Sequence, residues 1–317
     1  MKRLALLAAA TTLVLAGCDT TSTDSPAAVL SAADQDIAAT VVAGVLADQS
    51  NGFATDLNDL NGTMDRSGLS YSATMLGGDH GRGGGFGDRF WRPGDRQNGR
   101  VTYDSTSGTF TLVYDRTDSL RGFVRTAKAN LVYQYLTAAG TAIADPRRNR
   151  ALVHKVTYTG DREGTENGTS YRRDSTGTRT AAGTVARAYT SHAAWTLDGL
   201  TTTAATFAGD QASSGTMTLT RTDSLPVTTT YEATLTSSDV TISRDSTTAP
   251  EARVQGTLTY KVTTTIQRGS NTPVTKVSEG TITLDGKGGA LMRFEGINGS
   301  YYRIDLRDGT RERRRHG

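Results

Sequence analysis

The fold is decided by a stretch near the C-terminal end, ALMRFEGINGSYYRIDL, which occupies residues 290–306. Its two halves, residues 290–297 and 300–306, are rich in the apolar and aromatic side chains that are typical of strands. Asn298-Gly299 stands between them, and this pair is the strongest short-range indication of a two-residue hairpin turn. The sequence therefore predicts an antiparallel hairpin over these residues.

The same pattern continues toward the N-terminus. Two more strands are predicted at residues 254–267 and 274–284, and Asp285-Gly286 provides the next turn. Threonine alternates with apolar residues at 109–112, 216–219 and 281–284, which is typical of strands with one buried face. No long segment with a helical period interrupts the strands, so crossover helices are missing and the strands are expected to pair antiparallel.

We therefore expect a mainly β protein whose strands form a large antiparallel meander over residues 100–307. A sheet of this size has to hide its apolar face and its edges from water. The prediction is a sheet that curls into a barrel, a half-barrel or a sandwich.

Short turn motifs recur along the meander. The string Arg-Thr-Asp-Ser-Leu occurs at residues 116–120 and 221–225, after Gly-Thr-Phe-Thr-Leu and Gly-Thr-Met-Thr-Leu. This repetition indicates either a duplicated hairpin unit or a composition rich in a few residue types. Asp-Ser is expected to form turns because aspartate accepts hydrogen bonds from the backbone that follows it, and Gly-Thr is expected to open strands. The Asp-Ser pairs begin at Asp104, Asp118, Asp174, Asp223 and Asp245, and the Gly-Thr pairs at Gly108, Gly183, Gly215, Gly256 and Gly280.

A short helical segment is expected at residues 31–62. Ser31 and Asp34 have the spacing of a capping box, so a helix should begin there. The apolar residues that follow recur every four positions, which predicts an amphipathic helix that ends at Asn51-Gly52. A second short helix should follow and close at Asn61-Gly62. The apolar positions of the two helices are Ile37, Val41 and Val45, and Phe53, Leu57 and Leu60.

The first residues are typical of an export signal. Lys2 and Arg3 precede an apolar run at residues 4–15, which is too short to cross a bilayer because a spanning helix needs about 20 residues. The run ends in Leu15-Ala16-Gly17-Cys18, which closely resembles the lipobox of bacterial lipoproteins. The resemblance covers the leader and Cys18 only, and nothing in the rest of the chain is recognised.

The resemblance implies that the Cys18 thiol receives a diacylglyceryl group and that the chain is cleaved after Gly17. Acyl chains such as palmitate then hold the protein on a membrane, since each buried CH₂ group contributes about 0.8 kcal/mol. Cys18 is the only cysteine, so no disulfides are expected. We expect a signal peptide at 1–17, a flexible tether at 18–30 and one domain at 31–317 with a glycine-rich loop at 77–99.

Candidate chemistry is sparse. The histidines are His80, His154, His192 and His316, and none lies near a nucleophile motif such as Gly-x-Ser-x-Gly. The sequence predicts no catalytic residue, no metal site and no cofactor. An envelope hydrolase with an unrecognised active site remains the alternative, and it requires His154 or His192 to lie in a cleft within hydrogen-bond reach of a serine and a carboxylate.

Charge adds little. The formal net charge of +3 does not indicate a nucleic-acid partner. Residues 308–317 form a basic tail, which is expected either to stay in solvent or to contact anionic lipid headgroups.

These observations predict a membrane-anchored lipoprotein of the bacterial envelope with a non-enzymatic binding or structural role. The expected partners are membrane lipid through Cys18 and either an envelope protein or an amphiphilic ligand. An apolar cavity under the helices would favour a lipid carrier, whereas a solid core would favour a structural or protein-binding role. We expect the outer membrane, although Asp19 after the cysteine would favour the inner membrane under enterobacterial sorting rules.

Overall fold

The structure is a computed structural model, and it describes most of the chain after residue 100. The described residues are 30–47, 52–62, 100–120, 123–146, 149–173, 179–221, 225–243, 253–297 and 300–315. The leader, Cys18, the tether before residue 30 and the glycine-rich loop lie outside the described residues. Within the described part of the chain, no helix combines the length and the apolarity needed to cross a membrane.

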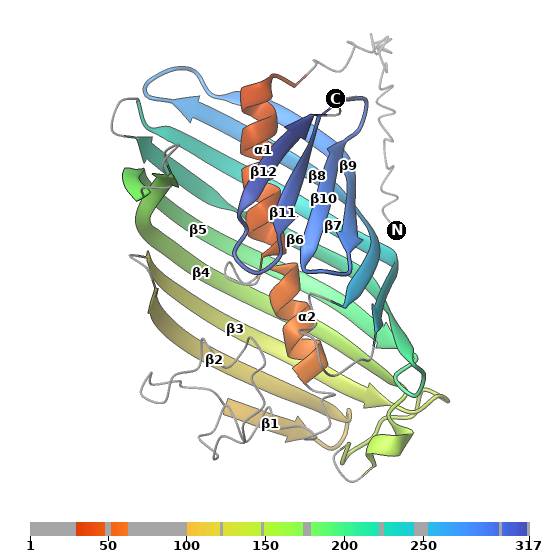
Figure 1. Cartoon of the computed structure of the whole chain (residues 1–317). Coiled ribbons are helices and arrows are strands. Elements are labelled where there is room, and N and C mark those ends of the chain that lie inside the picture. The colour runs from red at the N-terminus through yellow and green to blue at the C-terminus, as the bar shows by residue number, and fades with distance from the viewer. Residues whose placement is uncertain are drawn as a thin grey trace, which may run out of the picture.

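Twelve strands form one antiparallel sheet in which each strand pairs with the next along the chain, which confirms the predicted meander (Figure 1). The strands are β1 (Arg100–Asp104), β2 (Thr109–Leu120), β3 (Phe123–Leu136), β4 (Lys155–Arg173), β5 (Arg179–Asp198), β6 (Ala204–Arg221), β7 (Val227–Ser243), β8 (Val254–Arg268), β9 (Val274–Asp285), β10 (Gly289–Phe294), β11 (Ser300–Asp305) and β12 (Arg311–Arg315).

The last four predicted strands are confirmed within two residues at nearly every end, as β8 to β11. The two-residue turn predicted at Asn298-Gly299 is wrong, because β10 already ends at Phe294 and Arg293 pairs with Tyr301, which leaves a longer connection; Asn298 and Gly299 themselves lie outside the described residues. The predicted basic tail is wrong in one respect, because the meander does not stop at residue 307. Residues 311–315 form β12, which pairs with β11 along its whole length. An edge strand leaves much of its surface in solvent, so it tolerates a run of arginines that a central strand would not.

The sheet curls around two helices. In Figure 1, α1 (Ala32–Leu46) and α2 (Phe53–Gly62) follow one another across the concave face of the long strands. Strands β10–β12 pass over the other side of α1, and α1 has contacts with β7, β8, β9, β11 and β12. A single 3₁₀ turn, η3 (Arg150–Leu152), lies in the connection between β3 and β4. The helices therefore form the filling between two parts of one sheet.

The first helix begins as predicted and ends earlier than predicted. Ser31 is its N-cap, and the reciprocal capping box with Asp34 is present. The helix ends at Leu46, five residues before the expected Asn51, and Gly52 instead precedes α2. From residue 38 onward it is buried on most sides rather than on one stripe, with Ala39, Val42 and Leu46 fully buried. The amphipathic prediction is therefore wrong, because the sheet covers α1 from two directions.

The second helix agrees with its prediction. Phe53, Leu57 and Leu60 are fully buried, and the helix ends at Gly62. Phe53 packs edge-on against Trp195 of β5 and Phe207 of β6, with ring centroids 5.6 and 5.4 Å apart. These contacts place α2 in the middle of the sheet's concave face.

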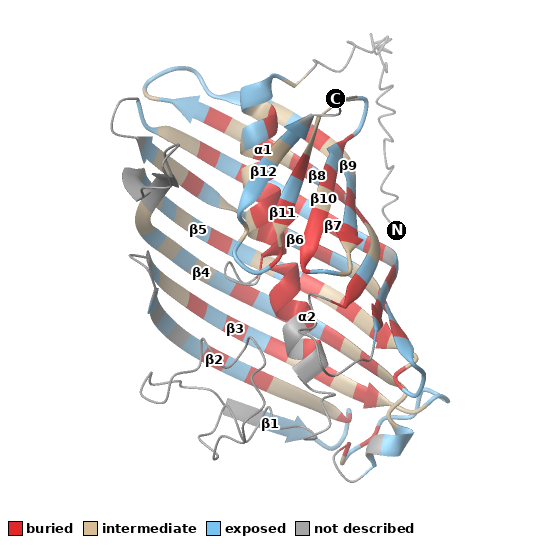
Figure 2. Ribbon diagram, viewed as in Figure 1, coloured by how far each residue is buried: buried red, intermediate tan, exposed pale blue. Residues whose placement is uncertain are grey.

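Burial alternates along the strands, as the threonine patterns predicted. Figure 2 shows the buried bands crossing the sheet. In β8, Leu258, Tyr260 and Val262 are buried, whereas Thr259 and Lys261 between them are exposed. Successive side chains of a strand point to opposite faces, so the sheet has an apolar inner face against the helices and a polar outer face.

The predicted strand openings at Gly-Thr pairs are confirmed only at Gly108, which directly precedes β2. The other four glycines lie inside strands, so the strands are longer than the pairs suggested: Gly183 in β5, Gly215 in β6, Gly256 in β8 and Gly280 in β9. Gly215 and Gly280 have a packing role. Each glycine is directly opposite a tyrosine of the neighbouring strand, Tyr231 and Tyr260. A Cβ atom at Gly215 would lie 2.9 Å from the Tyr231 Oη, because the tyrosine side chain lies across the glycine. The backbone oxygen of Ala188, on the other neighbouring strand, would lie closer still, so glycine is required by this backbone as well as by the tyrosine ring.

The predicted Asp-Ser turns are partly within the described residues. Asp104 makes its turn, since its carboxylate accepts hydrogen bonds from the Thr106 backbone (2.9 Å) and the Ser107 hydroxyl (2.7 Å). The turn predicted at Asp118 is wrong, because Asp118 lies within β2, which continues to Leu120. The remaining three pairs lie outside the described residues.

Candidate functional site

The site residues considered from sequence are widely separated. Cys18, His80 and His316 lie outside the described residues. His154 lies immediately before β4, and His192 lies within β5. The structure does not bring these two histidines to one place.

His154 belongs to a turn at the end of the sheet. Its Nδ1 is 2.9 Å from the Thr201 Oγ1, and its Nε2 is 3.2 Å from the Asp198 Oδ1. Asp198 also contacts the Lys155 ammonium at 3.5 Å and accepts a hydrogen bond from the backbone of Gly199. The carboxylate therefore organises the β5–β6 turn and ties it to β4, and the histidine is one of its partners.

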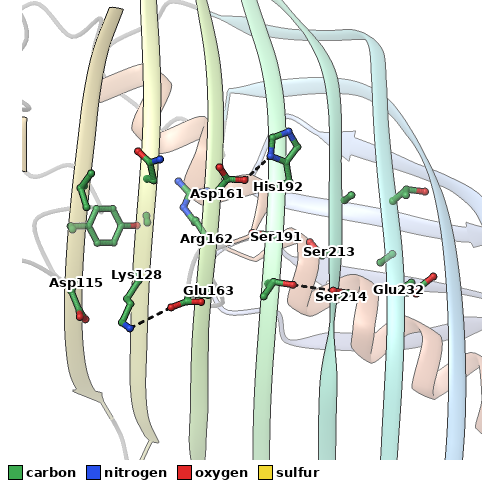
Figure 3. Close-up of a pocket in the computed structure, with 18 of the residues that line it drawn as sticks. Asp115, Lys128, Asp161, Arg162, Glu163, Ser191, His192, Ser213, Ser214 and Glu232 are labelled. Atoms are coloured by element: carbon green, nitrogen blue, oxygen red, sulfur yellow. Dashed lines mark hydrogen bonds and ion pairs between the residues drawn. The ribbon is translucent and has the colours of Figure 1, made fainter. Parts of the chain in front are cut away.

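His192 lies in a groove on the outer face of the sheet. The groove has a volume of about 1010 Å³ and crosses seven strands, from β2 to β8. Its lining includes exposed mid-strand residues that face away from the helices, such as Lys128, Glu163 and Ala212 (Figure 3). Because the groove lies on the side opposite the core, it is open to solvent along its length.

Differences in side-chain size explain why this surface is hollowed into a groove. Four small or β-branched outward residues of β5, β6 and β7 form the floor of the groove: Thr190, Ala212, Ser214 and Thr234. Longer side chains stand around them, including His192 of β5 and Glu232 of β7. The charged residues of the lining are Asp115, Lys128, Asp161, Glu163, Glu232 and Lys261.

Cross-strand pairs order the walls. The Glu163 carboxylate forms an ion pair with the Lys128 ammonium at 3.4 Å, and the two side chains are 59 % and 60 % exposed. Asp161 lies 2.7 Å from the His192 Nδ1, again directly across two neighbouring strands (Figure 3). Exposed pairs like these contribute about 0–1 kcal/mol to stability, so they define the chemistry of the surface more than they hold the fold.

The groove meets only part of the condition for a hydrolase. A carboxylate contacts His192, but the strand residue directly opposite the histidine is Ala212. The nearest outward serine, Ser214, pairs its hydroxyl with Thr190 at 3.0 Å. Within the described part of the chain, therefore, the hydrogen bond of the His192 ring goes to a carboxylate and none goes to a serine.

The most buried charged site lies on the inner face, and sequence reasoning missed it. Asp56 of α2 is fully buried, and its carboxylate accepts hydrogen bonds from Tyr158 Oη (2.7 Å), Trp195 Nε1 (2.9 Å) and the Arg162 guanidinium. The side chains of Arg162 and Asp56 are 1 % and 0 % exposed. This cluster anchors α2 to β4 and β5 and offers no access to a substrate.

A polar cluster also fixes the start of α1. Gln35 accepts hydrogen bonds from Ser300 (3.2 Å) and Arg313 (3.1 Å), and the Tyr302 hydroxyl donates to Asp36. Burial raises the pKa of Tyr302, and its hydrogen bond to the Asp36 carboxylate raises it further. These contacts place the N-terminus of α1 against β11 and β12.

Metal chemistry has little support in the described residues, where no group of three or more histidine, cysteine, aspartate or glutamate side chains is arranged to hold an ion. Comparison of the chain with family models, curated proteins and solved structures finds no match.

Proposed function

We propose that this chain is a lipid-anchored, non-enzymatic protein of the bacterial envelope, and that the outer-face groove binds a partner protein there. The anchor is supported by Leu15-Ala16-Gly17-Cys18 after a basic and apolar leader. Acyl chains on Cys18 would make attachment effectively permanent, so the domain needs no membrane-spanning element of its own.

The filled interior is the observation that favours a protein partner over an amphiphilic cargo. Side chains from both helices and from the inner face of the sheet form one continuous apolar cluster. Fully buried members come from α1 (Leu46), α2 (Leu57), β5 (Trp195) and β11 (Ile304). An acyl chain would have to displace these helices, whereas a partner on the outer face displaces only water.

The groove also has the chemistry of a protein-binding surface. It offers charges of both signs and hydroxyl groups along its length, which allows hydrogen bonds and ion pairs to a polypeptide. Seven strands at the usual spacing span roughly 30 Å, enough for an extended segment or the edge of a domain. The small side chains of the floor let such a segment approach the sheet closely.

Metabolic labelling tests the anchor. Cells expressing the full chain are fed a palmitate analogue that can be detected after gel separation, beside cells expressing Cys18→Ala. We expect label on the wild-type chain in the membrane fraction and none on the variant. Equal labelling of both chains would overturn the anchor.

Site-specific photocrosslinking tests the groove. A photoreactive residue is placed at Ala212, which lies on the groove floor, and at Thr206 as a control that is exposed on the same strand outside the lining. We expect one discrete crosslinked species in intact cells from position 212 and none from 206. The same adducts from both positions, or none from either, would contradict a binding role for this groove.

A further inference from the structure

One end of the sheet is the end from which the tether leaves. The guanidinium of Arg268, the last residue of β8, lies 4.0 Å from the Asp34 carboxylate in the first turn of α1. Residue 30 is the first described residue, and Cys18 lies twelve positions before it. Twelve residues can span at most roughly 40 Å, so a lipid on Cys18 would keep this end of the sheet within reach of the bilayer. We call this end of the sheet the tether end, and its opposite the far end.

The two ends of the sheet differ in the residues that terminate their strands. In an antiparallel meander the even-numbered strands all finish at one end, and here this is the tether end. Four of these strands end on an arginine: β4 at Arg173, β6 at Arg221, β8 at Arg268 and β12 at Arg315. Four of the odd-numbered strands end at the far end on an aspartate: β1 at Asp104, β5 at Asp198, β9 at Asp285 and β11 at Asp305.

Turn formation explains the aspartates. Each of them accepts a hydrogen bond from a backbone N–H of the turn that follows it, as Asp285 does from Lys287 (2.8 Å) and Gly289 (2.9 Å). For Asp305, burial alone would raise the pKa, but hydrogen bonds from Arg307 outweigh it and lower the pKa. Arginine has no comparable role in turns. Its recurrence at the tether end therefore calls for another explanation.

Exposed apolar side chains lie close to Arg268, the strand-end arginine whose side chain the structure describes. Leu225 lies just before β7 in the β6–β7 connection and is 66 % exposed, more than any other large hydrophobic residue described. Val274, the first residue of β9, is 47 % exposed. The two connections touch, since a Cβ atom at Gly269 would lie 3.1 Å from the Leu225 Cδ1. Leucine and valine beside an exposed arginine form the combination that binds membrane interfaces.

We propose that the tether end rests on the anionic surface of the bilayer that carries the Cys18 lipid. Leu225 and Val274 enter the headgroup region, and Arg268 contacts lipid phosphates. The guanidinium of Arg268 is attracted by the negative charge of anionic headgroups. The inference depends on the proposed anchor, and it adds an orientation that a flexible tether alone would not impose.

The orientation has a consequence for the groove. Ser214 on the groove floor lies seven positions before Arg221 in the same strand, which corresponds to at most roughly 25 Å at the usual rise of a strand. A domain that stands on its tether end holds the groove above the bilayer and open to the aqueous compartment. A domain that tumbles on its tether would bury the groove against lipid part of the time.

A fluorescent label on the lipidated protein tests the orientation. Cys18 is the only cysteine and is blocked by lipid in the proposed mature form, so a newly introduced cysteine can be labelled selectively with the polarity-sensitive dye NBD. Leu225→Cys carries the label at the tether end, and Leu152→Cys carries it in η3 near the far end, where the native side chain is 57 % exposed. Both proteins are reconstituted into phosphatidylcholine vesicles with and without phosphatidylglycerol.

We expect a blue shift and quenching by spin-labelled lipid at position 225 in the anionic vesicles, and a water-like spectrum at position 152. Arg268→Gln should reduce the shift at 225. Water-like spectra at both positions, or equal shifts at both, would overturn the orientation while leaving the anchor standing. A shift at 225 that is the same without phosphatidylglycerol would overturn the anionic surface. Dye on the wild-type chain would show Cys18 to be free and would overturn the anchor and the orientation together.

Discussion

Replacing Asp56 by asparagine removes the buried carboxylate that pairs with Arg162 in the interior. The amide has almost the same shape as the carboxylate, so packing around α2 should change little. The Arg162 side chain is 1 % exposed and would keep its charge while losing this ion pair. The hydrogen bonds from Tyr158 and Trp195 would also lose their charged acceptor.

The expected loss is large for a single substitution. Breaking a buried ion pair by removing one partner costs about 3–5 kcal/mol, because the remaining charge is left desolvated. Glu163→Gln is the matched control. It breaks the ion pair between Glu163 and Lys128 on the outer face, where the two side chains are 59 % and 60 % exposed. Such exposed pairs contribute about 0–1 kcal/mol, so the two variants should differ several-fold in their effect.

Urea denaturation with linear extrapolation measures both losses as free energies of unfolding. A third variant, Asp56→Leu combined with Arg162→Met, removes both charges, and it should be more stable than Arg162→Met alone because no buried carboxylate is left without its partner. The reasoning is refuted if Asp56→Asn costs no more than Glu163→Gln, or if the double variant is no more stable than Arg162→Met.

Three further outcomes are expected. Gly215→Ala should cost about 1–3 kcal/mol in urea denaturation, because the new methyl group meets the Tyr231 hydroxyl and the backbone of β5; a loss below 0.5 kcal/mol, roughly the scatter of neutral surface substitutions, would contradict this. Ser31→Ala should cost about 1 kcal/mol by removing the N-cap of α1, whereas Ser31→Asp should retain most of the stability. Burial raises the pKa of Tyr260 and Tyr302 above the ordinary tyrosine value of about 10. The stability from these neutral hydroxyls is complete below that pH and is lost as the pH rises above it, so both should ionise only on unfolding. A rise in absorbance at 295 nm that precedes loss of the native circular dichroism and is reduced in Tyr260→Phe or Tyr302→Phe would contradict the burial.

Much of the sheet could be predicted because its signals are local. The alternating residues of 254–306 determine the strands over a few positions, and the structure reproduces β8 to β11 closely. The hairpin of β10 and β11 forms, but its connection is longer than the two residues that Asn298-Gly299 predicted. The capping box of Ser31 and Asp34 is likewise a contact within one helical turn, and it forms as expected. The filled interior could not be predicted, since it depends on where a curled sheet places its two helices.

The remaining features depend on contacts between residues far apart in the sequence. Nothing in the sequence around Asp56 distinguishes it from other acidic residues in the first turn of a helix. Its partner Arg162 lies 106 positions later in the chain, and only the fold brings the two together. Gly215 was predicted to open a strand. Its packing role could not be predicted, because the tyrosine that lies across it belongs to another strand. The basic run at 311–315 had no apolar alternation, and it forms β12 because β11 offers an open edge. The groove results from differences in side-chain size across seven strands. It could not be predicted, because no single strand carries a sequence pattern that indicates it.

The proposed function depends most on Cys18 being acylated at a new N-terminus. Intact mass and N-terminal peptide analysis of the protein extracted from native membranes measures this directly. We predict that the chain begins at Cys18, lacks residues 1–17 and carries the added mass of a diacylglyceryl group, with or without a third acyl chain. A protein that retains the leader, or that begins elsewhere with an unmodified thiol at Cys18, would contradict the proposed function.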